Sequence, residues 1–181
     1  MTVYIIEYKA LPDRKAEHRI QKRLGDRLLE FVLRKDLGIE YEPEKVLKGP
    51  QGKPYLPDSP VKFNKSHSEG MVAVAMGTAE VGVDCQMIRP VTEALLNRTC
   101  GEGEKEIILS SEDPEREFAP TWARKEALVK MTGTGLTVPI REIASKIVTS
   151  FLMTESHAVA AVSEKGEEAK FVFLQEGDIG E

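Results

Sequence analysis

The chain has few cysteines and no long hydrophobic run, and both absences narrow the range of proteins it could be. Its 181 residues include two cysteines, Cys85 and Cys100, which are too few for a disulfide framework and lack the neighbouring cysteine or histidine pairs of a zinc site. No apolar run approaches the roughly 20 residues that a membrane-spanning helix needs. Residues 1–10 carry polar and charged side chains where a secretory signal needs an unbroken apolar stretch. We therefore expect a cytoplasmic protein that does not insert into a membrane.

An excess of positive charge is also lacking. The chain has 25 Lys and Arg against 30 Asp and Glu, a net charge of -5, so we expect no nucleic-acid binding through a generally basic surface. The charges are unevenly placed, because residues 9–35 are mainly basic and residues 101–117 mainly acidic. A local anion site is therefore compatible with the acidic total. The length suits one domain, or two small halves that share a core.

Hydrophobic periodicity and turn residues predict that helices and strands are mixed along the chain. Residues 3–8 indicate a strand, and apolar residues at helical spacing predict an amphipathic helix near 13–35. Two apolar runs, 71–76 and 79–85, flank Gly77-Thr78, which favours a hairpin with a type II′ turn and a central antiparallel sheet. We expect further helices at 91–99, at 102–109 and from a first turn at Pro120 to a stop at Gly133, strands at 147–152, 158–162 and 170–174, and a frayed C-terminus.

Two carboxylates and a lysine are the first candidates for chemistry. Asp84 ends an apolar strand, where an ionised carboxylate is costly unless it is paired or holds a cation, although an aspartate that caps the next turn is about as plausible. In the late helix, Trp122, Glu126 and Lys130 are spaced by four and share one side. Glu126 and Lys130 could equally form an ordinary surface ion pair worth a few tenths of a kcal/mol.

A run of polar residues at 63–68 is the second candidate. Phe63-Asn64-Lys65-Ser66-His67-Ser68 combines hydroxyls, an imidazole and an amide, a set suited to holding phosphate oxygens. A hydrolase triad built on Ser66 or Ser68 with His67 is the obvious rival. Adjacent strand residues point to opposite faces, however, and no Gly-x-Ser-x-Gly turn surrounds them, so the hydrolase interpretation is disfavoured.

Taken together, these segments resemble the Sfp-type 4′-phosphopantetheinyl transferases. Four motifs occur in the order of that family, over a match from about residue 18 to residue 143: Gly52-Lys53-Pro54-Tyr55, Phe63-Asn64-Lys65-Ser66-His67-Ser68, Gly82-Val83-Asp84 and Trp122-Ala123-Arg124-Lys125-Glu126-Ala127-Leu128-Val129-Lys130. The fourth motif is the most specific. The resemblance implies magnesium-dependent transfer of 4′-phosphopantetheine from coenzyme A to a serine of an acyl or peptidyl carrier protein, with release of adenosine 3′,5′-bisphosphate.

The resemblance also implies roles for individual residues. Asp84 and Glu126 would hold Mg²⁺, an ion that takes one or two protein carboxylates and completes its shell with phosphate oxygens and water. Lys130 would meet the diphosphate of coenzyme A and neutralise the leaving charge. Glu126, directly or through a metal-bound water, could remove the serine proton.

Further family positions concern the nucleotide and the metal. Ser66 and His67 match residues that contact the nucleotide phosphates, and Lys53 matches a lysine that reaches the adenosine end of coenzyme A. The first helix should supply an arginine to the 3′-phosphate, and Arg19 is favoured slightly over Arg23. Where many relatives carry a second acid two residues after the aspartate, this chain has Gln86, which either ligates the metal through its amide oxygen or leaves that position to water.

The fold implied is α+β, with two halves related by a pseudo-twofold axis, each an antiparallel sheet packed on a long helix. We expect the halves to be residues 1–77 and 78–181, with coenzyme A in the cleft between them, and the protein to be a monomer. An alternative is a coenzyme A-binding homologue with reduced or lost transferase activity, which Gln86 and the short N-terminal region would explain. A third possibility is an interaction domain whose motifs only pack a core.

Overall fold

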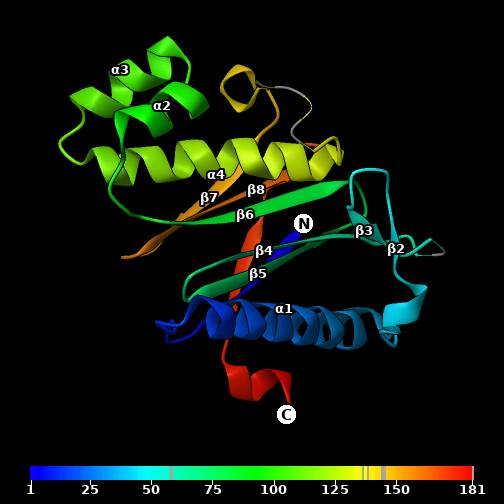
Figure 1. Cartoon of the computed structure of the whole chain (residues 1–181). Coiled ribbons are helices and arrows are strands. Elements are labelled where there is room, and N and C mark those ends of the chain that lie inside the picture. The colour runs from blue at the N-terminus through cyan, green and yellow to red at the C-terminus, as the bar shows by residue number, and fades with distance from the viewer. Residues whose placement is uncertain (58, 136, 138, 144–145, 181) are drawn as a thin grey trace.

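The computed structural model describes residues 1–57, 59–135, 137, 139–143 and 146–180. The strands are β1 (Thr2–Glu7), β2 (Leu47–Lys48), β3 (Pro54–Tyr55), β4 (Lys62–Ser68), β5 (Met71–Gly77), β6 (Val81–Met87), β7 (Thr149–Met153), β8 (His157–Ser163) and β9 (Lys170–Leu174). The α-helices are α1 (Arg14–Leu37), α2 (Glu93–Thr99), α3 (Glu102–Ser110) and α4 (Pro114–Thr132), and the 3₁₀ turns are η1 (Pro43–Lys45), η2 (Ile140–Glu142) and η3 (Glu176–Ile179). Figure 1 shows their arrangement.

The first sheet packs on α1. Its strand order is β4-β5-β1-β9, and α1 covers one face of it. Asp13 caps the helix by accepting a hydrogen bond from the Ala16 N–H, and Gly38 ends it in the left-handed conformation, so the helix expected near 13–35 is confirmed. Apolar side chains of α1 and of one sheet face form a buried cluster that includes Leu24, Leu28, Ile6 and Val74.

The second sheet packs on α4. Its order is β6-β8-β7, all antiparallel, and α4 lies across the face that points away from the first sheet. Ala123, Ala127 and Met131 of α4 meet Ala160 and Val162 of β8 in a buried cluster. The alanines of this cluster let the helix lie close to the sheet.

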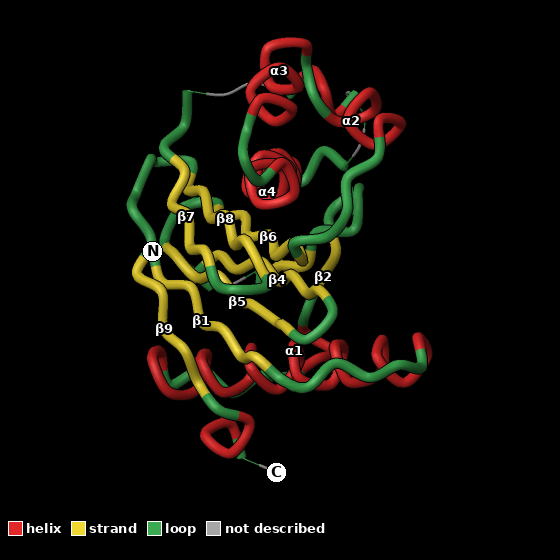
Figure 2. The backbone as a smooth tube through the Cα atoms, turned by 90° about the vertical axis from the view of Figure 1, so that its left-hand side faces the viewer, coloured by secondary structure: helices red, strands yellow, loops and turns green. Residues whose placement is uncertain are grey.

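The two sheets face each other between α4 and α1 (Figure 2). Val3, Ile5 and Ala73 of the first sheet pack against Val83 and Val159 of the second in one fully buried cluster. Strands β1 and β5 therefore bury both of their faces, which explains why their sequences are almost continuously apolar. The architecture confirms the α+β class, with a sheet packed on a long helix in each layer.

The hairpin expected around Gly77-Thr78 is wrong. β5 pairs with β4 and β1, whereas β6 pairs with β8, so the chain crosses from the first sheet to the second between residues 77 and 81. Two adjacent apolar runs have the same local pattern whether they pair with each other or enter different sheets. The pairing depends on distant partners that the local pattern does not contain.

The late helix also begins earlier than expected. Asp113 accepts a hydrogen bond from the Arg116 N–H as the cap of α4, and Pro114, not Pro120, occupies the first turn. Pro120 lies inside the helix. Two prolines six residues apart offered two helix starts, and the capping aspartate before Pro114 is the feature that distinguishes them.

The C-terminal segment returns to the first sheet. β9, which lies near the end of the chain, pairs in parallel with β1 at the edge of that sheet. The expected fraying is wrong up to residue 180, because η3 follows β9 and buries Ile179 against the α1 cluster. Among the described residues, the helices are too short or too polar to cross a membrane.

Candidate active site

A close approach of α4 to β6 brings the predicted carboxylates and lysine together. A Cβ added to Gly82 would overlap the Ala127 carbonyl oxygen and would lie 2.7 Å from the Met131 amide nitrogen. Only glycine therefore permits this contact between strand and helix backbone. Asp84 follows two residues later on β6, and Glu126 and Lys130 lie one turn apart on α4.

Asp84 is the centre of a hydrogen-bonded cluster although its side chain is only 4% exposed. Its Oδ1 lies 2.5 Å from the Lys130 Nζ and accepts a hydrogen bond of 2.8 Å from the Ser66 hydroxyl. Its Oδ2 accepts a bond of 2.6 Å from the Gln86 side-chain amide. The buried carboxylate is thus compensated by a cation and two neutral donors, as a charge in such a site must be.

Side chains of β4 join the first sheet to the second. The Asn64 Oδ1 accepts a bond of 3.0 Å from the Val83 N–H. The hydroxyl oxygens of Ser66 and Ser68 accept bonds of 3.2 Å from the N–H groups of Cys85 and Met87 respectively. Because side chains alternate along a strand, every second residue of β4 points to the edge of β6 and accepts a hydrogen bond from its backbone. This side-chain ladder fixes β6, and with it Asp84, against the first sheet.

The environment of Glu126 favours its neutral form. Partial burial and the negative charge of Asp84 raise the pKa of Glu126, while the ammonium group of Lys130 opposes the rise. The two carboxylates are therefore close enough to interact through their charges. A carboxylate with a raised pKa is a better proton acceptor than one in water.

The donor set suits a hard cation. Each carboxylate oxygen can accept about two hydrogen bonds; the Oδ1 of Asp84 has two, whereas its Oδ2 has one from Gln86. The negative charge of Asp84 destabilises the ionised form of Glu126, and a cation between the two carboxylates would remove that repulsion. Within the described residues, no group of three or more His, Cys, Asp or Glu side chains could hold a metal. One or two protein carboxylates, with the rest of the shell taken from a ligand and water, are the ligands that Mg²⁺ usually has.

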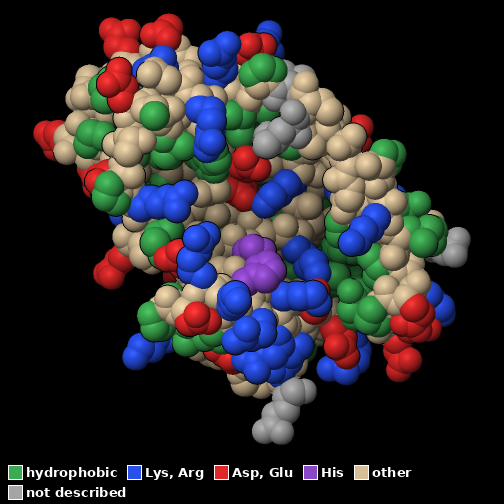
Figure 3. Space-filling view, viewed as in Figure 1, with side chains coloured by type: hydrophobic (Ala, Val, Ile, Leu, Met, Phe, Trp, Pro, Cys, Tyr) green, Lys and Arg blue, Asp and Glu red, His purple; other side chains and the backbone are tan. Residues whose placement is uncertain are grey.

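His67 lies on the opposite side of β4 from Ser66, toward α1. Its ring contacts that of His18 edge-on with the centroids 6.1 Å apart, and the neighbouring Lys65 pairs with Asp26 of α1 at 2.5 Å. Although His67 is exposed as a residue, protein atoms crowd its ring, and this desolvation, with the charges of Lys130 and His18, lowers its pKa. Figure 3 shows histidine side chains surrounded by Lys and Arg, with acidic side chains above them. The chemistry of this surface suits an anion.

The other predicted nucleotide contacts lie apart from the Asp84 cluster. The Lys53 ammonium group bonds to the Met131 carbonyl at 2.6 Å and to Glu80 at 2.5 Å, so it closes the C-terminal end of α4. Arg19 and Arg23 are both exposed on α1. The α1 side chain that reaches the His67 ring is His18, which the sequence reasoning missed because it is one polar residue among many on that helix.

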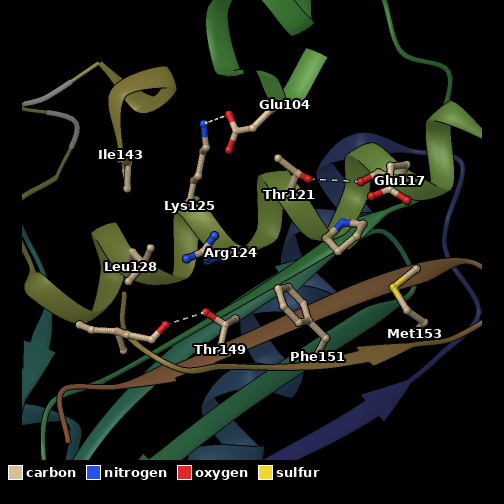
Figure 4. A pocket seen from close by; sticks show the side chains of 12 residues that line it. Glu104, Glu117, Thr121, Arg124, Lys125, Leu128, Ile143, Thr149, Phe151 and Met153 are labelled. Carbon is tan, nitrogen blue, oxygen red and sulfur yellow. Dashed lines mark hydrogen bonds and ion pairs between the residues drawn. The ribbon is translucent and has the colours of Figure 1, made fainter. Parts of the chain in front are cut away.

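A hollow lies between α4 and β7 (Figure 4). Lys125 points from α4 toward α3, where its buried ammonium group meets Glu104 at 2.6 Å and the Thr99 carbonyl at 2.8 Å. The Glu104 carboxylate also accepts a bond from the Gly101 N–H. Lys125 thus anchors α2 and α3 to the helix that carries Glu126, and it faces away from the Asp84 cluster.

Comparison with known proteins assigns the chain to a family. The model of the 4′-phosphopantetheinyl transferase superfamily matches residues 80–170, a stretch that includes Asp84, Glu126 and Lys130. The chain belongs to this superfamily, which confirms the family that the sequence motifs predicted.

Several curated proteins are similar to it. The 4′-phosphopantetheinyl transferase Sfp of Bacillus subtilis strain 168 is 27% identical over 127 residues, which cover 68% of this chain and 57% of Sfp. The 4′-phosphopantetheinyl transferase HetI of Nostoc sp. strain PCC 7120 is 33% identical over 129 residues, which cover 66% of this chain and 54% of HetI. The chain thus spans little more than half the length of these relatives. The crystal structure of Thermotoga maritima holo-[acyl-carrier-protein] synthase overlaps 47% of this chain and 63% of its own, with 23% identity and a TM-score of 0.38.

Proposed function

We propose that the protein transfers 4′-phosphopantetheine from coenzyme A to a serine hydroxyl of an acyl or peptidyl carrier protein. The observation that carries this proposal is the pairing of Lys130 with the buried Asp84 beside Glu126, because these groups supply a cation for a diphosphate, a metal-binding carboxylate and a base. The superfamily match over the same residues supports it.

The proposed reaction exchanges one phosphorus–oxygen bond for another. The carrier serine oxygen attacks the phosphorus that bears pantetheine, and the bond from that phosphorus to the bridging oxygen breaks. Adenosine 3′,5′-bisphosphate leaves with the electron pair of that bond. The serine proton passes to Glu126, whose raised pKa suits an acceptor, either directly or through water.

Charge on the leaving group is the main electrostatic demand of this reaction. Lys130 uses two of its three N–H donors on Asp84 and Ser66, so one remains for a diphosphate oxygen. We propose that Asp84 and Glu126 hold Mg²⁺ with Gln86 beside them. When bound, the ion neutralises charge on the diphosphate oxygens.

The nucleotide would extend from this centre toward α1. His67 is the group that we propose for the phosphates, with His18 beside it, and Arg19 extends the basic surface along α1. Glu80 and the carbonyls of Val81 and Met131 engage all three N–H donors of Lys53, so this lysine would reach the adenosine end only by giving up at least one of these bonds. We therefore propose a smaller contribution to coenzyme A binding from Lys53 than from His67.

Intact-mass spectrometry of carrier proteins tests the proposal. Incubation with coenzyme A and Mg²⁺ should add one phosphopantetheine group to an acyl or peptidyl carrier, and Glu126→Ala should abolish the addition. Glu117→Ala is the matched control, because Glu117 is exposed on the same helix and lines the hollow between α4 and β7.

The alternative, a coenzyme A-binding homologue without transfer, makes a different prediction. If folded wild-type protein binds coenzyme A in calorimetry but modifies no member of a panel of carriers, the alternative replaces the transferase. If it neither binds coenzyme A nor modifies a carrier, both proposals fail.

A further inference from the structure

Three elements meet at the hydroxyl of Ser66. This residue belongs to β4 of the first sheet, Asp84 to β6 of the second, and Lys130 to α4. The hydroxyl donates to the Asp84 Oδ1 at 2.8 Å and accepts from the Lys130 Nζ at 2.9 Å and from the Cys85 N–H at 3.2 Å. Ser66 is 5% exposed.

These three bonds fill the hydrogen-bonding capacity of a serine. A hydroxyl has one proton to donate and two lone pairs to accept with, and each is engaged. A phosphate oxygen could accept a hydrogen bond from Ser66 only if the hydroxyl stopped donating to the buried Asp84, which would then lose one of its donors. The geometry therefore opposes the phosphate contact that the family resemblance implies for Ser66.

The direction of the side chain agrees with this. Ser66 points to β6 together with Asn64 and Ser68, whereas His67 and Lys65 point to the α1 side, where the exposed basic groups lie. Neighbouring residues of a strand face opposite ways, so Ser66 and His67 do not form one phosphate clamp.

We propose that Ser66 is a positioning residue that orients the Asp84–Lys130 pair across the boundary between the two sheets. The inference rests on the proposed transferase function. Asp84 and Lys130 come from the second layer alone, and the Ser66 hydroxyl ties both to the first layer, which carries His67. The reacting groups and the phosphate-binding groups are thereby held in register, which is what transfer between two bound substrates requires.

The chain contains its own control for this role. Ser68 accepts a 3.2 Å bond from the Met87 N–H, the same kind of bond that Ser66 accepts from Cys85, but it does not bond to Asp84 or Lys130. Ser66→Ala and Ser68→Ala therefore remove equivalent ladder bonds. Only Ser66→Ala also removes the hydrogen bonds to Asp84 and Lys130, and Ser66→Thr keeps the hydroxyl.

The first test needs no transfer activity. Urea unfolding of Ser66→Ala and Ser68→Ala is compared in the wild type and in Lys130→Met, which removes the ammonium partner but keeps much of the apolar stem. We expect Ser66→Ala to be the more destabilising of the two serine variants, and its excess to shrink in the Lys130→Met background because partners in contact are not additive. Equal effects of the two variants in both backgrounds would overturn the proposal.

The second test separates positioning from phosphate binding. Calorimetry without Mg²⁺ should give a dissociation constant for coenzyme A within about two-fold of wild type for Ser66→Ala, while kcat at saturating coenzyme A falls about ten-fold and Ser66→Thr restores it. Binding that is ten-fold weaker with an unchanged kcat would make Ser66 a phosphate ligand and refute the positioning role. If wild type transfers nothing, the transferase proposal fails, and the unfolding experiment still decides whether Ser66 holds the pair.

Discussion

At the scale of single residues, the site pairs two carboxylates under unequal conditions. Asp84 is deeply buried and bonded to Lys130, Ser66 and Gln86, whereas Glu126 is half-buried and carries a raised pKa. Two carboxylates in unlike environments can take different roles in one reaction. Ionisation of Glu126 therefore lowers the stability of the folded state.

Replacing Glu126 by glutamine should stabilise the protein and stop the reaction. Because burial and Asp84 raise the pKa of Glu126 in the folded state, ionising it costs stability as the pH rises above its unfolded value near 4.5. We expect Glu126→Gln to have a higher Tm than wild type at pH 7.5 without metal, and a difference that vanishes near pH 4. Transfer should fall by about 10² or more. Thermal unfolding across this pH range checks the first expectation, and a lower Tm for the variant at pH 7.5 would contradict it.

Gln86 should set the strength of metal binding. Its amide donates to the Asp84 Oδ2, the oxygen with a lone pair to spare, and a glutamate there would place a third negative charge beside Asp84 and Glu126. We expect Gln86→Glu to lower the Mg²⁺ concentration for half-maximal activity by about three- to ten-fold, because added carboxylate charge strengthens binding of a hard cation. Metal titrations of transfer measure this, and EDTA should abolish transfer in both proteins. Identical titration curves would exclude Gln86 from the metal site.

How far the sequence predicts the site depends on whether a role is local. An apolar strand end and a helical spacing of four single out Asp84, Glu126 and Lys130 as candidates, and the family resemblance supplies their expected roles. In the structure Lys130 bonds to Asp84, and the charges of both act on Glu126. The contact between His18 and His67 joins a helix to a strand, and no spacing along the chain encodes it. The three partners of Ser66 are equally non-local, so the sequence shows a serine in a polar run but not that its bonds are filled.

At the scale of elements, Gly82 controls the distance between β6 and α4. Expected strands and helices were largely found, but their partners were not, as the pairing of β5 and β6 with different sheets illustrates. A pattern of apolar residues predicts that a face is buried. Which surface covers that face depends on the whole chain. The role of Gly82 likewise depends on a distant segment, because the α4 backbone lies directly against it.

Gly82→Ala should separate the catalytic elements. The added methyl group would overlap the Ala127 carbonyl and lie 2.9 Å from the Met131 Cβ, and backbone atoms cannot move aside as a flexible side chain can. We expect a loss of about 2–4 kcal/mol in the free energy of unfolding, at or above the usual range for overpacking. Transfer should fall further than stability does, because Lys130 would move away from Asp84.

Gly103→Ala is the control for this variant. Gly103 lies in α3 with nothing within 4 Å of an added Cβ, so alanine there should stabilise the helix by about 0.5–1 kcal/mol and leave transfer unchanged. Urea unfolding and carrier modification are measured for both variants. If Gly82→Ala retained wild-type activity, the close approach would not matter for the site.

At the scale of the whole molecule, the two halves are joined in three ways. The cluster between the sheets mixes residues of β1 and β5 with residues of β6 and β8, and it is fully buried. The side-chain ladder from β4 completes the edge of β6. Strand β9, near the end of the chain, completes the first sheet beside β1. These three links indicate that the two halves depend on each other for their folding.

Fragments divided at residue 77 should not fold separately. Residues 1–77 would lack β9 and expose the inner face of their sheet, and residues 78–181 would expose the matching face of the other sheet and leave the edge of β6 without its acceptors. Each fragment would keep only one side of the buried cluster between the sheets, and small domains have little stability to spare. We expect neither fragment alone to unfold cooperatively in urea, and an equimolar mixture to regain a cooperative transition and transfer activity. A cooperative transition in either isolated fragment would show that one half holds its own core, and the site would then be a junction between independent domains instead of a product of their shared interior.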